Sequence, residues 1–292
     1  MKKIRKCVIP AAGMWTRFLP ATKALPKEMF PIIDKPVMQI LVEEAISAWC
    51  EDIIIVTWRS KRAIEDHFDS NFELEDRLDK SWKFDYLKTV KDLNKMANIV
   101  YVRQPYPRGD WDAILRTKNL IWDEPFLVLF WDDIVDNWEN TAAKQLVTAF
   151  ERKNNPVIAT VPVTDEQVSN YWIIETESTD ESMFSVSKFL EKPKSTQTSS
   201  RNWVIWKYVV TPDIFDYLEK SEWKLWDWEI RLADAFELMR QDRDIYWVKI
   251  EWIRYDTWSK MWFLEAIVSA ALKRDDLKDE FREFLEKKLE EK

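Results

Sequence analysis

The sequence has few glycines, histidines and cysteines and no long apolar run, and each shortage disfavours a class of protein. A single histidine, His67, argues against a Ser-His-Asp hydrolase and a histidine-rich zinc site, and its helical context predicts a structural role. The two cysteines, Cys7 and Cys50, match no metal-binding spacing and would make a poor disulfide framework. That pattern favours a reducing compartment. No stretch approaches the roughly 20 apolar residues of a membrane span, so we expect a cytoplasmic protein without a membrane segment.

Glycine is the most unusual shortage, with 2 residues in 292, and it is matched by an excess of tryptophan, with 18. Average usage of about 7% would give roughly twenty glycines, close to the two counts together. Many tryptophans lie in polar stretches where a turn would normally contain glycine, such as SWKF near 82 and DNWEN near 138. The pattern indicates that tryptophan occupies most glycine positions. The alternative is a naturally Trp-rich surface for carbohydrate or aromatic ligands, although these stretches lack the spacing of a stacking platform.

Short apolar runs alternate with helical periodicity along the first part of the chain, which predicts a mostly parallel sheet covered on both faces. Shorter strands with polar turns then predict an antiparallel excursion, and the last charged segment predicts a solvated helix that docks by one face. The predicted strands are 8–12, 51–57, 97–104, 125–130, 155–163, 171–178, 183–192, 204–212 and 246–257. The predicted helices are 37–49, 62–80, 141–154, 213–220, 229–242, 261–274 and 275–292.

A basic loop follows the first predicted strand, at the edge where open α/β sheets bind their ligands. It runs from Gly13 to Pro31 and carries Arg17, Lys23 and Lys27 between prolines that limit its freedom. The chain as a whole has a net charge of −8, which argues against a nucleic-acid binder and makes a basic cluster stand out. The loop therefore predicts phosphate binding, with a solvated basic loop as the alternative. Neither GxxxxGK[ST] nor GxGxxG is present.

Carboxylates follow two other predicted strands. Asp132 and Asp133 come after the fourth strand, and Asp256 comes near the end of the strand at 246–257. Carboxylates from two strand ends, facing a polyphosphate, are a usual way to hold Mg²⁺, although an acidic pair after a strand is often only a helix cap. With little machinery for covalent catalysis, such a site suits phosphoryl or nucleotidyl transfer, in which positioning and charge neutralisation do most of the work.

Long motifs in the chain resemble the bacterial and archaeal UTP:glucose-1-phosphate uridylyltransferases, the UDP-glucose pyrophosphorylases. The similar segments include TRFLPATKALPKEM, SKRAIEDHFD, VRQPYPRGDWDAIL, FWDDIVD, FLEKPK and YDTWSKMWFLEA, and the resemblance extends from about residue 4 to residue 274. It implies a single nucleotidyltransferase domain over 1–292, with a Rossmann-like mixed α/β sheet. Within it we expect a nucleotide-binding half at about 1–135, a sugar-binding half at about 136–265 and C-terminal helices at about 266–292. The resemblance also implies a homo-dimer or homo-tetramer.

The resemblance implies transfer of UMP from UTP to glucose 1-phosphate, assisted by Mg²⁺, with UDP-glucose and pyrophosphate as products. Roles for individual residues follow by motif. Arg17 and Lys27 would hold the triphosphate, Ala11, Ala12 and Gly13 would approach the base and ribose, and Gln104 and Gly109 would read the uracil edge. Asp132 and Asp256 would bind Mg²⁺, Glu191 would hold glucose hydroxyls and Lys192 the sugar phosphate, with Trp172 beside the sugar.

Tryptophan stands at places where the resembled family commonly has glycine, and we expect consequences for stability and activity. The positions are Trp15, Trp58, Trp111, Trp131, Trp172, Trp206, Trp228 and Trp258. A tryptophan at a position that needs φ > 0 costs about 1–2 kcal/mol, and eighteen such costs would exceed the 5–15 kcal/mol that stabilises a typical domain. Because indoles would also point toward the nucleotide and the sugar, we expect little or no transferase activity. The remaining alternatives are a thymidylyl- or adenylyltransferase of the same fold and a non-catalytic, Trp-rich binding protein.

Overall fold

A mixed nine-stranded sheet forms the centre of the computed structural model, which describes residues 3–13, 18–106, 108–136, 139–177, 184–221, 232–251, 253–256 and 259–291. The strand order is β5-β4-β1-β6-β11-β8-β12-β10-β9, and β11 and β10 run against the others. The strands are β1 (Lys6–Pro10), β4 (Asp52–Thr57), β5 (Asn98–Arg103), β6 (Phe126–Leu129), β8 (Val157–Pro162), β9 (Trp172–Thr176), β10 (Phe184–Glu191), β11 (Asn202–Val210) and β12 (Tyr246–Lys249). The predicted α/β class, with an antiparallel excursion, is confirmed.

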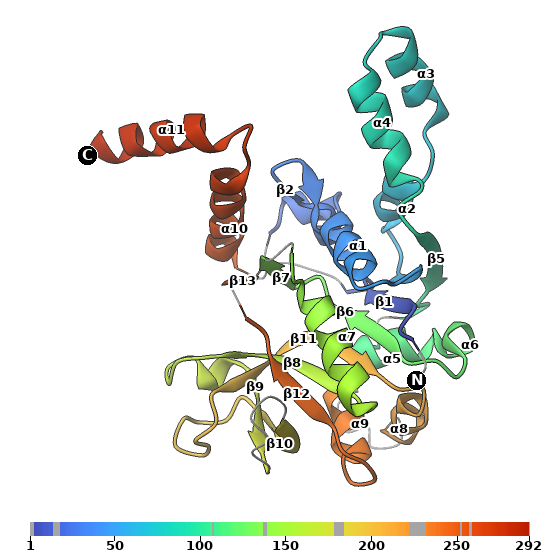
Figure 1. The fold of residues 1–292 in the computed structure, drawn as a ribbon, viewed down its shortest axis with the longest axis vertical. Helices are drawn as coiled ribbons and strands as arrows, with labels where there is room; N and C mark the ends of the chain where they lie inside the picture. The colour runs from blue at the N-terminus through green and yellow to red at the C-terminus, as the bar shows by residue number, and fades with distance from the viewer. Residues whose placement is uncertain are drawn as a thin grey trace.

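Two small antiparallel pairs lie outside this sheet. They are β2 (Pro31–Ile32) with β3 (Lys35–Pro36), and β7 (Asp133–Asp136) with β13 (Ile253–Asp256). The prediction of one strand over 246–257 is therefore wrong, because this segment forms β12 in the main sheet and then β13 beside β7. The change of partner carries the chain out of the main sheet to a position beside β7, which follows β6 (Figure 1).

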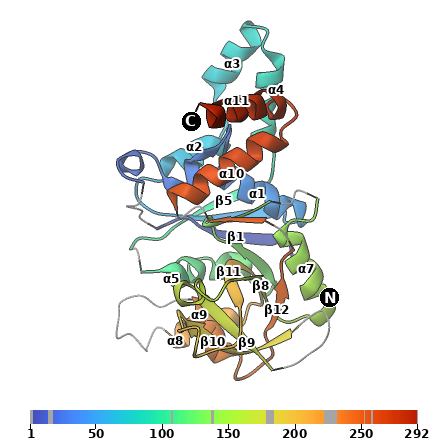
Figure 2. The same cartoon turned by 90° about the vertical axis from the view of Figure 1, so that its left-hand side faces the viewer.

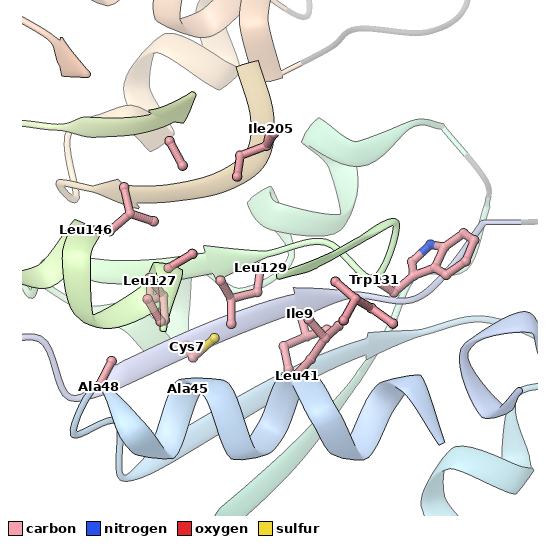
Figure 3. Packing of buried hydrophobic residues seen from close by; sticks show 14 of the residues in the cluster. Cys7, Ile9, Leu41, Ala45, Ala48, Leu127, Leu129, Trp131, Leu146 and Ile205 are labelled. Carbon is pink, nitrogen blue, oxygen red and sulfur yellow. The ribbon is translucent and has the colours of Figure 1, made fainter. Parts of the chain in front are cut away.

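Helices cover both faces of the sheet because side chains along each strand alternate between two apolar clusters (Figure 2). In β1, for example, Cys7 and Ile9 face the first cluster and Val8 the second. The first cluster includes residues of α1 (Val37–Ser47), α7 (Ala142–Lys153) and α10 (Lys260–Lys273), and the second includes residues of α5 (Asp110–Leu115), α8 (Ile214–Ser221) and α9 (Leu232–Met239). Figure 3 shows the first cluster between α1 and the strands, with Trp131 at its end.

The remaining helices project from this core or lie at its rim. The periodic segment 62–80 is two helices, α2 (Arg62–Phe68) and α3 (Phe72–Lys80), and α3 forms a hairpin with α4 (Phe84–Leu93), which the sequence analysis did not identify. The rim helix α6 is Lys118–Ile121. The last helix, α11 (Lys278–Glu290), has no buried residue and extends away from the sheet (Figure 1), so the prediction that it docks on the body is wrong. No described helix is long and apolar enough to cross a membrane.

Three tryptophans have a positive φ one or two residues beyond the end of a helix. Their φ angles are 69° at Trp49, 58° at Trp82 and 60° at Trp122, where ψ is −132°. Asn154 has φ 54° at the corresponding place after α7. Glycine and, less often, asparagine are the usual residues at this helix-ending position, because a Cβ clashes with the backbone there. Trp49, Trp82 and Trp122 therefore have the backbone conformation that glycine adopts most readily.

Candidate functional site

The carboxyl ends of the parallel strands β1, β4, β5 and β6 meet at one edge of the sheet, and the segments that follow them form the candidate site. Ala11 and Ala12, just beyond β1, are buried, and the Ala11 amide donates to the Val56 carbonyl oxygen of β4 at 2.8 Å. The Gln104 amide donates to the Thr57 carbonyl oxygen at 2.9 Å, so the end of β5 is tied to the end of β4. Predicted nucleotide-binding residues from two strand ends thus share this edge.

Lys27 of the basic loop is buried at this edge between a glycine and an indole. A Cβ added to Gly13 would lie 3.2 Å from Lys27 Nζ, and Nζ lies 4.0 Å from the centroid of the Trp131 ring. Burial lowers the pKa of Lys27, whereas the nearby Asp132 and Glu28 carboxylates oppose this shift. The Lys27 ammonium therefore lies above Gly13 and is also covered by the Trp131 indole. Nothing in the sequence indicated this contact between Lys27 and Trp131. Arg17, the other predicted phosphate ligand, lies outside the described residues.

A buried ion pair fixes the loop beside Lys27. Lys61 Nζ donates to both carboxylate oxygens of Glu28, at 2.8 and 2.6 Å, and both side chains are buried. Sequence reasoning missed this pair. Lys61 follows the second predicted strand, and the rule that ligands bind beyond strand ends could have drawn attention to it, as it did to residues after the first and fourth predicted strands. The pair joins the loop to the segment between β4 and α2.

Aromatic packing holds the other side of the loop. The rings of Phe18, Phe30 and Phe263 meet edge to face, with centroids 5.5 to 6.1 Å apart. Phe263 belongs to α10, and Arg274, at the end of the same helix, forms a 2.6 Å ion pair with Asp34. The C-terminal helix α10 is thus part of the support of an N-terminal loop, and the candidate site depends on segments far apart in sequence.

The three predicted acidic positions divide into different environments. Asp133 is fully buried and its Oδ2 accepts a 3.0 Å hydrogen bond from the Trp206 amide, which is a structural role in β11. Asp132 is also buried and lies close enough to Lys27 to influence its pKa. In the β13–β7 pair, Asp256 is the register partner of Asp133, so the backbone brings it within one residue of Asp132. The backbone positions of Asp132 and Asp256 therefore lie close together, although they are far apart in the sequence.

Gln104 and Gly109 are joined by their own hydrogen bonds. Gln104 Nε2 donates to the Gly109 carbonyl oxygen at 3.1 Å and to Asp112 Oδ2 at 2.9 Å. Gly109 has φ 94° and ψ −178°, a conformation that essentially only glycine adopts, and it precedes the first turn of α5. Trp111, in that turn, is buried in the second apolar cluster. Asp112 is a further polar residue of this group that the sequence analysis did not single out.

The three predicted sugar-site residues lie together at the other end of the sheet. Glu191, the last residue of β10, is the register partner of Trp172, the first residue of β9. The Lys192 amide donates to the Tyr171 carbonyl oxygen at 3.1 Å, and Lys192 has φ 44°, a strained value for lysine. Trp172 is half-buried and packs against the second apolar cluster, which also contains Trp111. The polar Glu191 and Lys192 are exposed beside an aromatic wall.

Among the described residues, no group of three or more histidine, cysteine, aspartate or glutamate side chains could hold a metal ion. A site of one or two carboxylates completed by substrate phosphates remains compatible with this arrangement, because Mg²⁺ usually takes its other ligands from phosphate and water. His67, the single histidine, contacts Gln39 at 3.1 Å and stacks edge to face on Phe68. These contacts agree with its predicted structural role.

Comparisons with known proteins agree on one family. The family model described as nucleotidyl transferase matches residues 6–273. A UTP–glucose-1-phosphate uridylyltransferase 2 of Staphylococcus saprophyticus is 46% identical over 287 residues, covering 98% of this chain and 99% of the relative. A UTP-bound UGPase from Acinetobacter baumannii superimposes with a TM-score of 0.90 at 31% identity, covering 97% and 98% of the two chains. A UDP-glucose pyrophosphorylase complexed with UDP-glucose has a TM-score of 0.79 at 35% identity, covering 93% and 100%.

Proposed function

Because this chain belongs to the nucleotidyl transferase family, among the UTP–glucose-1-phosphate uridylyltransferases, we propose that it transfers UMP from UTP to glucose 1-phosphate. The observation that carries the proposal is the near-complete match to uridylyltransferases in both sequence and fold. The arrangement of Lys27, Gln104 and Asp132 around one sheet edge supports it, since these residues supply a cation, a base-reading amide and a carboxylate.

In the proposed reaction, a phosphate oxygen of glucose 1-phosphate attacks the α-phosphorus of UTP. The new P–O bond forms as the bond from the α-phosphorus to its bridging oxygen breaks, and pyrophosphate leaves with that oxygen. The nucleophile belongs to the substrate, so no covalent enzyme intermediate is required. Lys27, together with Arg17, neutralises charge on the triphosphate, and the backbone around Ala11, Ala12 and Gly13 allows close approach of the nucleoside.

We propose Asp132 and Asp256 as the Mg²⁺ ligands. The donor set fits this ion, because two aspartates whose backbone positions lie close together would offer hard carboxylate oxygens, and Asp132 lies near the Lys27 ammonium. When bound, Mg²⁺ would neutralise phosphate charge and orient the triphosphate. The other neighbouring carboxylate, Asp133, is already engaged by the Trp206 amide, which favours Asp132 as the ligand.

For the sugar, we propose that Glu191 accepts hydrogen bonds from glucose hydroxyls and that Lys192 pairs with the sugar phosphate. Their exposure supports these roles, as does the half-buried Trp172 directly across from Glu191, because an indole face packs well on a pyranose ring. The strained backbone at Lys192 is a further sign of a functional position.

The test is formation of UDP-glucose and pyrophosphate from UTP and glucose 1-phosphate with Mg²⁺, using protein of verified mass. A panel of UTP, dTTP and ATP separates the uridylyl reaction from thymidylyl and adenylyl transfer. D132N should abolish turnover, whereas D123N, a matched change of an exposed carboxylate, should leave it unchanged. Quenching of indole fluorescence by sugar or nucleotide without pyrophosphate release would instead identify a non-catalytic binding protein.

We also propose a cytoplasmic homo-dimer or homo-tetramer. Exposed apolar side chains on the two projecting elements support self-association: Phe284 and Leu289 on α11, and Phe72, Trp82 and Phe84 on the α3–α4 hairpin. The buried free thiols of Cys7 and Cys50 are compatible with a reducing compartment. Light scattering on the purified protein gives the subunit number, and a monomer at micromolar concentration would refute the oligomer.

A further inference from the structure

Gln104 carries a side-chain amide whose orientation is set by its neighbours. An amide has a donor end and an acceptor end, and it reads a nucleobase differently according to which end faces the base. Gln104 is only 2% exposed, and its donor end meets two oxygens that can only accept, the Gly109 carbonyl and Asp112 Oδ2. Turning the amide over would place its oxygen against both of these oxygens. The donor end is therefore held away from the base, and the acceptor Oε1 is left for a ligand.

Asp112 is in turn fixed by a second charge. Its Oδ1 accepts a 2.7 Å hydrogen bond from Nη2 of Arg116, which follows α5 directly and lies four residues after Asp112. The carboxylate is buried, so its two oxygens have defined partners on opposite sides, Arg116 and Gln104. The result is a chain of hydrogen bonds from a solvent-accessible guanidinium to the amide at the end of β5. No described residue donates a hydrogen bond to Gln104 Oε1.

We propose that Asp112, held by Arg116, is a positioning residue that makes Gln104 select a pyrimidine with an N3–H donor and reject one with an N3 acceptor. The inference rests on the proposed function, in which Gln104 faces the base. Uracil carries hydrogen at N3, whereas the N3 of cytosine is an acceptor and would oppose Oε1. Fixing the Gln104 amide raises discrimination against cytosine. A glutamine free to turn over would accept a hydrogen bond from N3–H of uracil in one orientation and donate one to N3 of cytosine in the other.

The test compares UTP with CTP in parent, D112N, R116M and K118M proteins. D112N keeps the shape of the side chain but lets Gln104 turn over, since an asparagine amide presents either a donor or an acceptor. R116M removes the group that orients Asp112. K118M is the matched control, because Lys118 is in the adjacent helix, pairs with Glu219 and is 41% exposed, against 40% for Arg116.

Equilibrium dissociation constants for the two nucleotides are measured by calorimetry, and kcat/KM for each is measured by pyrophosphate release. The UTP/CTP preference should fall by about tenfold or more in D112N, fall less in R116M and stay unchanged in K118M. If Asp112 had a merely structural role, D112N would weaken the binding of UTP and CTP equally and leave the UTP/CTP preference unchanged. A ratio in D112N within about twofold of the parent overturns the proposal. If D112N does not fold, equal ratios in R116M and K118M overturn it.

Binding and turnover separate this proposal from the proposed function. A parent protein that prefers UTP in binding but releases no pyrophosphate would refute the transferase function while leaving the role of Asp112 testable by affinity. A parent that makes UDP-glucose while D112N retains full preference for UTP would refute the role of Asp112 alone.

Discussion

Replacing Trp49, Trp82 and Trp122 together by glycine should stabilise the protein. Each has a positive φ, and relieving a Cβ clash in that region is worth about 1–2 kcal/mol. Glycine also gives the unfolded chain more conformational freedom, which reduces this gain in stability by about 0.4–1 kcal/mol at each position. The balance is about 1 kcal/mol per site, or about 3 kcal/mol for the triple variant if the sites are independent, as expected for three separate helix ends.

Loss of apolar burial does not cancel this gain. The three indoles are 80%, 80% and 76% exposed in the folded protein. A real unfolded ensemble already buries roughly 10–40% of the surface that an extended chain would expose. The indoles are therefore about as exposed after folding as before it, and removing them changes the hydrophobic contribution little.

The assay is thermal and urea unfolding of the parent, the triple Trp→Gly variant and the triple Trp→Ala variant. Alanine removes the indoles but keeps Cβ, so only the glycine variant should gain the full stability, about 5 °C in melting temperature. W203G provides the opposite control, because Trp203 is buried and stacks on Tyr171 at 3.6 Å between ring centroids. It should lose about 3–5 kcal/mol. Equal stabilities of the glycine and alanine variants would refute the reasoning.

Three further sets of variants test the site and its surroundings. W131G should uncover the Lys27 ammonium and raise kcat/KM by up to about thirtyfold. This factor corresponds to the loss of a buried cation–π contact of about 2 kcal/mol. An unchanged kcat/KM would contradict the prediction. Removing one partner of the buried Glu28–Lys61 pair, as in E28L or K61M, should cost about 3–5 kcal/mol in urea unfolding, whereas E28L/K61M should recover most of it. Burial lowers the pKa of His67 below its ordinary 6.5, so the unfolded chain binds the proton first as pH falls. Stability should therefore decrease as pH falls below about 6.5, and H67Q should remove that part of the slope.

Much of the fold could be predicted from the sequence because strand and helix periodicities were clear. The segments 51–57 and 141–154 illustrate this, since each became one element with nearly the predicted bounds. The strand predicted over 246–257 failed because apolar alternation continues through Ile250 while the pairing partner changes from β8 to β7. Periodicity reports which face of a strand is buried, but the partner is set by long-range packing.

In the candidate site, too, some features could be predicted from the local sequence and others depend on long-range packing. The rule that ligands lie beyond strand ends pointed to Lys27 and Asp132, whereas Gln104 was predicted only from the family resemblance, and the structure places all three residues at one sheet edge. It could not find the Trp131–Lys27 contact or the Asp112–Gln104 hydrogen bond, because these depend on side-chain directions that become defined only when strands and helices pack.

Replacing a tryptophan by glycine should have one of two opposite effects, depending on its position. At exposed helix ends such as Trp49, the penalty is backbone strain remote from the site, so the glycine variant should gain stability and keep its activity. At Trp131 the indole is buried in the first apolar cluster and also covers Lys27, so the glycine variant should lose stability and gain activity. The two glycines of the chain fit this distinction. Gly109 adopts a φ that turns its carbonyl toward Gln104, and a Cβ at Gly13 would crowd the Lys27 ammonium. Tryptophan at either position would thus damage the chemistry of the site directly, which neither core packing nor surface exposure could offset.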